Sequence, residues 1–193
     1  MVADEMSREP VSVLDRPDTV ARLFLGVSVP EPVKTRLQET AKSSFGQYIE
    51  RIVPAEQWHL TLFFFGDVRN HAQYLGRLTL PLKEAFVPTI TISHIGRGKA
   101  RDQLWAYVNP TPALLNLREA LNERLRKIHF PRPVEFRSFH PHIRLAKFYP
   151  VVRRLGIADV PHRTAYAIRE AYLYRSTLAP HGSTYTIEAT IPF

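Results

Sequence analysis

Two short segments of the chain share a pattern that limits how the chain can fold. Residues 58–62 (WHLTL) and 141–145 (PHIRL) each place a histidine two positions before a polar residue, with apolar residues in between. Successive side chains of a strand point to opposite faces, so His59 shares a face with Thr61, and His142 shares one with Arg144. The opposite, leucine-containing faces require a core. The chain must therefore form two half-buried strands whose histidine faces meet water or a cleft.

Apolar periodicity and turn residues predict the elements around these two strands. Strands outnumber helices, and the hairpins favour antiparallel pairing in an α+β fold. Thr111 is a suitable N-cap for the longest helix, with Pro112 at its first position. We expect strands over 22–29, 58–65, 89–95, 103–108, 140–148, 165–174 and 184–191, and helices over 31–41, 69–80 and 111–129. Residues 1–20 are polar and aperiodic, which predicts a flexible tail, and residues 21–193 are expected to form a single domain.

The composition excludes several classes of protein. The chain has 193 residues, of which 45% are hydrophobic, which is too many for a disordered protein. It has no cysteine, and this excludes disulfides, thiolate zinc sites and cysteine nucleophiles. No apolar run is long enough to span a bilayer, and the N-terminal residues lack the apolar core of a secretory signal. We therefore expect a cytoplasmic protein with no membrane partner, and a monomer by default.

The net charge points to nucleic acid without deciding for it. Lys and Arg outnumber Asp and Glu by 26 to 18, which gives a formal charge of +8. A basic surface attracts polyanions, but a charge of this size also serves solubility. The turn over 96–102 carries Arg97, Lys99 and Arg101, and it is either a solvated loop or a guide for an RNA backbone. Trp105, on the strand after this turn, is assigned to the core unless it stacks on a base at a cleft mouth.

Two imidazoles that converge on one pocket would suit phosphoryl transfer. A neutral imidazole can take a proton from attacking water, and a protonated one can give a proton to the leaving oxygen. The donors of Thr61 and Arg144 could then hold the phosphate oxygens. A lone histidine on an apolar strand is more often structural than catalytic. The matched pair, His59 and His142, instead suggests an internal repeat in which each lobe contributes one histidine.

The sequence resembles the 2H phosphoesterase superfamily, in particular the RNA 2',3'-cyclic phosphodiesterases of the LigT-like, or 2'-5' RNA ligase, family. That family carries two His-x-Thr/Ser motifs. Residues 56–66 (EQWHLTLFFFG) match the first motif fully, and residues 141–147 (PHIRLAK) match the second with two substitutions. An Arg-Leu-Phe strand that begins at Arg22 also agrees with the family. The resemblance covers about residues 21–193.

The resemblance implies a fold and a set of roles. The fold would be bilobal and α+β, with two antiparallel sheets that flank a central cleft and helices on the outer faces. His59 would be the proton donor to the departing ribose oxygen, and His142 the proton acceptor that activates water. The substrate would be RNA with a 2',3'-cyclic phosphate end, opened to a 2'-phosphate without a metal or cofactor. The family's reverse reaction joins such an end to a 5'-hydroxyl in a 2'-5' linkage.

The second motif departs from the family at two positions. Arg144 replaces the Thr or Ser, and its guanidinium can donate charge-assisted, bidentate hydrogen bonds to a phosphate. It either holds the phosphate in place of the hydroxyl or crowds the pocket and weakens the enzyme. Lys147 replaces an Arg and should point away from His142 unless a bulge intervenes. His140 lies on the same strand face as His142, as a supporting partner or a rival base.

Three functions are compatible with these residues. The leading one is a metal-independent phosphodiesterase acting on RNA 2',3'-cyclic phosphate ends. The second is a non-catalytic RNA-end binding protein that lost turnover through Arg144. The third is a metal hydrolase, which is disfavoured because no His-x-x-x-His motif or acidic cluster lies near His59 or His142.

Overall fold

The computed structural model describes residues 19–79, 87–131, 139–179 and 182–193. The predicted tail over 1–20 lies outside these residues, except for Thr19 and Val20, as does the last residue of the predicted helix over 69–80. In chain order the elements are β1 (Val20–Ser28), α1 (Glu31–Phe45), η2 (Gly46–Tyr48), β2 (Ile49–Ile52), η3 (Ala55–Gln57), β3 (His59–Arg69), α2 (Ala72–Leu78), β4 (Thr89–Arg97), β5 (Gln103–Val108), α3 (Pro112–Lys127), β6 (His142–Phe148), η4 (Pro150–Arg154), β7 (Val160–Ala167), β8 (Glu170–Ala179) and β9 (Gly182–Pro192), where η marks a 3-10 helix.

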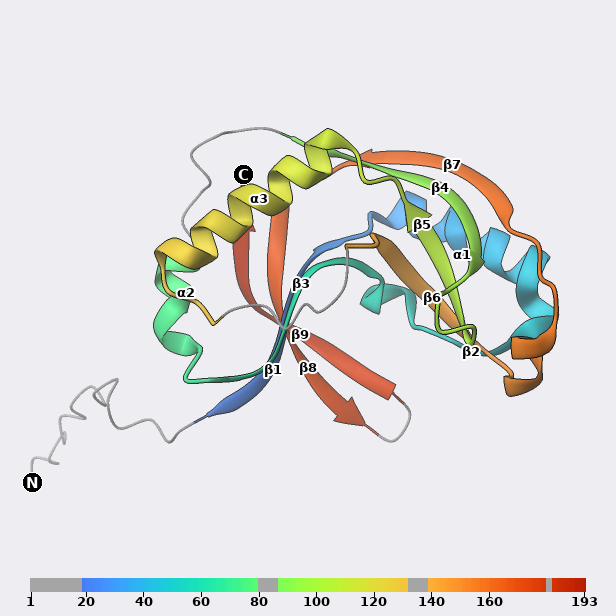
Figure 1. Ribbon diagram of the computed structural model, residues 1–193, viewed down its shortest axis with the longest axis horizontal. Coiled ribbons are helices and arrows are strands. Elements are labelled where there is room, and N and C mark those ends of the chain that lie inside the picture. Colours follow the sequence, from blue (N-terminus) through green and yellow to red (C-terminus); the bar gives the residue numbers. More distant parts are fainter. Residues whose placement is uncertain (1–18, 80–86, 132–138, 180–181) are drawn as a thin grey trace, which may run out of the picture.

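The strands form one antiparallel sheet rather than the two sheets that the resemblance implied. Its order across the described residues is β7-β4-β5-β6-β3-β1-β8-β9, with β2 paired to β6. The two halves meet at β3 and β6, whose pairing in the described chain consists of Leu60 with Ile143. Both side chains are fully buried, so the core runs through this joint and keeps the sheet continuous. The expected two-lobed arrangement survives as two halves that diverge on either side of one residue pair (Figure 1).

The helices cover the face of the sheet that carries the buried residues. α1 packs on the half containing β6 and β7, where the rings of Phe45 and Phe148 lie 6.5 Å apart. α3 lies along the other half, where Arg118 donates a hydrogen bond from Nε to the Leu62 carbonyl. Thr111 is the N-cap of α3, as predicted, because its hydroxyl accepts from the Leu114 amide at 3.3 Å. No helix of the described residues combines the length and apolarity needed to cross a membrane.

The predicted strand over 165–174 is wrong. The structure divides it into β7, which pairs with β4, and β8, which pairs with β1 in the other half of the sheet. Between them the Ile168 amide donates to the Pro88 carbonyl, and the Arg169 carbonyl accepts from the Phe193 amide. The crossing contains no glycine or proline, so the sequence carries no turn signal there. The short strand β2 was also not predicted, because its four residues show no clear alternation.

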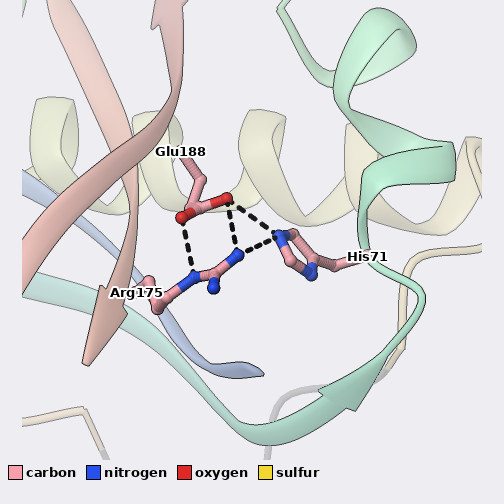
Figure 2. A network of polar contacts seen from close by, with 3 residues as sticks. All are labelled: His71, Arg175 and Glu188. Carbon is pink, nitrogen blue, oxygen red and sulfur yellow. Dashed lines mark hydrogen bonds and ion pairs between the residues drawn. The ribbon is translucent and has the colours of Figure 1, made fainter. Parts of the chain in front are cut away.

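A buried histidine ties α2 to the β8–β9 hairpin. His71, which precedes α2, is 2% exposed, although the polar residues Arg69 and Asn70 precede it in the sequence. Its Nε2 lies 2.9 Å from Glu188 Oε2, and Arg175 Nε lies 2.7 Å from Glu188 Oε1 (Figure 2). Burial raises the pKa of the Glu188 carboxyl, but the hydrogen bonds from His71 and Arg175 outweigh it and hold the pKa below its usual value. The ionised carboxylate therefore stabilises the folded state.

This network predicts a pH-dependent contribution to stability. Glu188→Gln is expected to lower the free energy of unfolding at pH 7 by about 1–3 kcal/mol, because it leaves two donors with a weaker, uncharged partner. The folded-state pKa of Glu188 is depressed, so its contribution is present at neutral pH and is lost as the pH falls through that pKa. Urea unfolding at pH 7 and at about pH 3 measures both effects.

The exposed pair Glu123–Lys127, 3.8 Å apart, supplies the matched control. Glu123→Gln removes the same charge from a solvated helix face and is expected to cost under about 0.5 kcal/mol. Equal losses in the two variants, or no loss in Glu188→Gln, would contradict the structural role of the network.

Candidate active site

The histidine faces of β3 and β6 open into one pocket. It has a volume of about 600 Å³ and takes residues from both halves of the sheet. Its lining is Arg51, Ile52, Val53, Pro54, Gln57, His59, Thr61, Gln103, His142, Arg144, Gly182, Ser183, Thr184 and Tyr185. All four residues selected from the sequence, namely His59, Thr61, His142 and Arg144, therefore lie on its wall. Gly182 to Tyr185, at the start of β9, reach the pocket from the other end of the chain.

The two histidines are fixed by the same kind of local hydrogen bond. His59 Nδ1 lies 2.7 Å from the Gln57 carbonyl, and His142 Nδ1 lies 2.7 Å from the His140 carbonyl. In both cases the acceptor is the backbone two residues earlier. A carbonyl can only accept, so each Nδ1 carries a hydrogen. Each neutral ring then keeps the lone pair of Nε2 for chemistry in the pocket.

Aromatic rings fix the plane of each imidazole. The ring of Phe24 stacks on His59 with centroids 4.5 Å apart, and Tyr185 meets the same imidazole edge-on at 5.1 Å. Trp105 stacks on His142 with centroids 3.6 Å apart and an interplanar angle of 16°. The sequence assigned Trp105 to the core. Its side chain is buried, at 8% exposure, but it lies on the histidine face of the sheet outside the main apolar cluster, where the indole supports His142.

A glycine leaves room for His59 beside β1. A Cβ added at Gly26 would lie 2.8 Å from the Leu60 carbonyl oxygen and 3.5 Å from Cδ2 of His59. Side chains at this position would therefore push β1 and β3 apart. The sequence gave no reason to single out Gly26, because the requirement arises from a neighbouring strand.

Burial favours the neutral form of both imidazoles. Burial lowers the pKa of His59 to about 4, against the raising effect of the Gln57 carbonyl, and the nearby charge of His142 lowers it further. Burial also lowers the pKa of His142, against the raising effect of the His140 carbonyl, with His140 and Arg144 as further lowering charges. Both rings are therefore neutral at pH 7. An anion between them would favour their protonated forms.

The other basic residues near the second motif have partners elsewhere. Lys147 is not among the residues of the pocket wall and lies 2.7 Å from Glu50 Oε2, which agrees with its expected direction. The side chain of His140 contacts the Lys99 ammonium, so the supporting role of His140 toward His142 comes from its backbone carbonyl. Arg97 donates to the carbonyls of residues 152, 153 and 155. It therefore holds η4 in place, and the role of the turn over 96–102 as a guide for RNA stays a prediction.

Several residues of the pocket wall were not expected from the sequence. They are Arg51, Gln57, Gln103, Ser183 and Thr184, which come from four separate segments. Gln57 lies within the first motif but was not singled out, and the other four belong to neither histidine motif. Tyr185, three residues after Gly182, also lines the pocket. Within the described ranges, no group of three or more His, Asp or Glu side chains is arranged to hold a metal ion.

The fold and the paired histidines define a class of protein, and comparison with known families agrees. The family model of the 2'-5' RNA ligase superfamily matches residues 29–154. The chain belongs to this superfamily. The matched range contains β3 and β6, and with them both histidine motifs.

Curated relatives cover most of the chain at low identity. An RNA 2',3'-cyclic phosphodiesterase of Archaeoglobus fulgidus is 26% identical over 175 residues, which are 85% of this chain and 96% of that protein. The protein of the same name from Thermotoga maritima is 28% identical over 178 residues, or 86% of this chain and 92% of that protein. Among solved structures, Escherichia coli LigT complexed with NADP+ superposes with a TM-score of 0.71 at 23% identity, covering 91% of this chain and 99% of that one. The last comparison shows a shared fold.

The depressed pKa of His59 yields a prediction that needs no substrate turnover. In an NMR titration of the ligand-free protein, the His59 ring is expected to titrate near pH 4. Inorganic phosphate should raise this pKa by roughly one unit or more, because an anion favours the imidazolium. The exposed His129 serves as an internal reference whose resonances phosphate should leave unchanged. A His59 pKa near 6.5 without ligand, or one that ignores phosphate, would contradict the burial argument.

Proposed function

We propose that the chain is a metal-independent RNA 2',3'-cyclic phosphodiesterase that opens cyclic phosphate ends to 2'-phosphates. The observation that carries this proposal is the matched pair of imidazoles. Each has Nδ1 bound to a backbone carbonyl, and each is left with Nε2 for one shared pocket. Two such groups suffice for general acid and base catalysis at a phosphorus centre. The names of the distant relatives and of the superfamily support the same reaction.

The proposed mechanism uses one histidine on each side of the phosphate. His142 takes a proton from water as the water oxygen bonds to phosphorus. His59, protonated when the anionic substrate is bound, gives its proton to the ribose 3' oxygen as the bond between that oxygen and phosphorus breaks. Thr61 and Arg144 donate hydrogen bonds to the non-bridging oxygens, where negative charge develops. With a 5'-hydroxyl in place of water, the same steps would form a bond from its oxygen to phosphorus, and the ribose 3' oxygen would again leave with the proton of His59.

Arg144 supports a second candidate function, an RNA-end binding protein with little or no turnover. Its side chain is exposed at the pocket wall, where a short hydroxyl would sit closer to the strand. We favour the enzyme, because both imidazoles keep the arrangement that the chemistry needs. The planar guanidinium can also donate bidentate hydrogen bonds to a phosphate, so Arg144 is suited to hold the substrate.

The two histidines give the direct test of function. Incubation with an RNA that ends in a 2',3'-cyclic phosphate should yield a 2'-phosphate, and a strong chelator should not prevent it. His59→Ala and His142→Ala should each lower kcat by about 10²–10⁴-fold, the usual contribution of a general acid or base. Both variants should bind the 2'-phosphate product within a few-fold of the unaltered protein. No conversion, or a 3'-phosphate product, would contradict the proposal.

Arg144→Thr separates the enzyme from the binding protein. If the guanidinium holds the phosphate, this change should lower kcat/KM by roughly 10- to 100-fold, as the loss of one well-placed donor does elsewhere. Arg153→Thr is the matched control, because Arg153 pairs with Asp102 and is not part of the pocket wall. A sharp rise in activity in Arg144→Thr would show that the arginine obstructs the pocket.

A further inference from the structure

His142 lies against the face of a tryptophan from the neighbouring strand. The register pairs Tyr107 with His142 and Trp105 with Arg144, so the indole reaches the imidazole diagonally across β5 and β6. The centroid distance of 3.6 Å and the interplanar angle of 16° describe two rings in full face-to-face contact. Such a stack fixes the plane of the imidazole. The hydrogen bond to the His140 carbonyl fixes its rotation within that plane.

The indole is itself held on two sides. Its Nε1 donates a hydrogen bond of 2.8 Å to Gln103 Oε1. A Cβ added at Gly98 would lie 2.4 Å from Cε2 of Trp105, so the glycine backbone supports the ring where no other residue would fit. Gly98, Gln103 and Trp105 therefore form one support for His142, built from the β4–β5 turn and β5.

The surroundings of His142 offer little other stabilisation for a positive charge. Among the residues that the structure describes, the titratable and charged groups that face it are His140, Arg144, His59 and Tyr107, and none of these is an acid that is ionised at neutral pH. Within the described chain, the one hydrogen-bond partner of its Nδ1 is a neutral carbonyl, where many catalytic histidines have a carboxylate. An indole face attracts cations more strongly than a phenyl face does.

We propose that Trp105 is the positioning residue of His142: it aligns the imidazole and stabilises the imidazolium that forms when His142 takes the proton of water. The catalytic part of this inference rests on the proposed function. His59 has a phenyl ring, Phe24, in the equivalent place at the longer distance of 4.5 Å. The stronger cation-binding ring thus lies under the histidine that gains a proton during the reaction, and the weaker one lies under the histidine that loses it.

Substitution of Trp105 should change kcat and leave substrate binding nearly intact. Trp105→Leu keeps an apolar contact but removes the aromatic face, and it should lower kcat by about 10- to 30-fold, with KM within about twofold. Trp105→Phe restores a weaker face and should recover most of this loss. In NMR titrations, the pKa of His142 should fall by up to about one unit in Trp105→Leu, because the charged form loses its partner. This second measurement needs no activity, so it still tests the stack if the proposed reaction is absent.

A double-mutant cycle separates support of His142 from general stability. Gly98→Ala should displace the indole and reproduce much of the Trp105→Leu effect, and it should add little when Trp105 is already Leu. Trp58→Phe is the control, because Trp58 is also buried but donates to the Val53 carbonyl and makes no ring contact with His142 among the described residues. It should lower thermal stability without moving the His142 pKa. Additive effects of Gly98→Ala and Trp105→Leu, a His142 pKa that is unchanged or raised, or equal kcat values in the Leu and Phe variants would overturn the proposal.

Discussion

The single pairing of Leu60 with Ile143 is the constraint on which the arrangement depends. It joins the two halves of the sheet, and its two side chains are fully buried. Because the strands run antiparallel, His59 and Arg144 flank the pair at one end, and Thr61 and His142 flank it at the other. Side chains beside a buried pair point to the opposite face. The residues that hold the halves together therefore also aim four polar side chains into the space where the halves diverge.

Each half treats its histidine in the same way, and this similarity has a chemical consequence. A carbonyl two residues earlier accepts a hydrogen bond from Nδ1, and an aromatic ring stacks on one face of the imidazole. Burial within the protein lowers the pKa of both histidines and leaves them neutral. In the proposed mechanism, neutral His142 acts as the base, whereas His59 needs the charge of a bound anion before it can act as the acid. Under that proposal, the pocket couples the binding of an anion to the uptake of the proton that the reaction requires.

Local patterns in the sequence predicted the parts of the structure that depend on local physics. The face shared by His59 and Thr61, the strand over 103–108 and the N-cap at Thr111 follow from alternation or from capping, and the structure has all three. The prediction failed where distant segments decide. The run over 165–174 contains no glycine or proline to mark a turn, yet the chain changes from β4 to β1 as its partner inside that run. His71 stands among polar residues, and its burial arises from Glu188 and Arg175, more than a hundred positions away.

The sequence by itself determined that His59, Thr61, His142 and Arg144 face the pocket, because strand alternation is local. It also carried the family, through two short motifs. Only the tertiary structure decided that the strands form one sheet and that Trp105 stacks on His142. It also decided where glycine is required: Gly98 leaves room for the indole of Trp105, and Gly26 lets β1 approach β3 closely. These features depend on contacts between strands that are distant in sequence. The periodicity of one strand does not indicate which side chains the neighbouring strand places beside it.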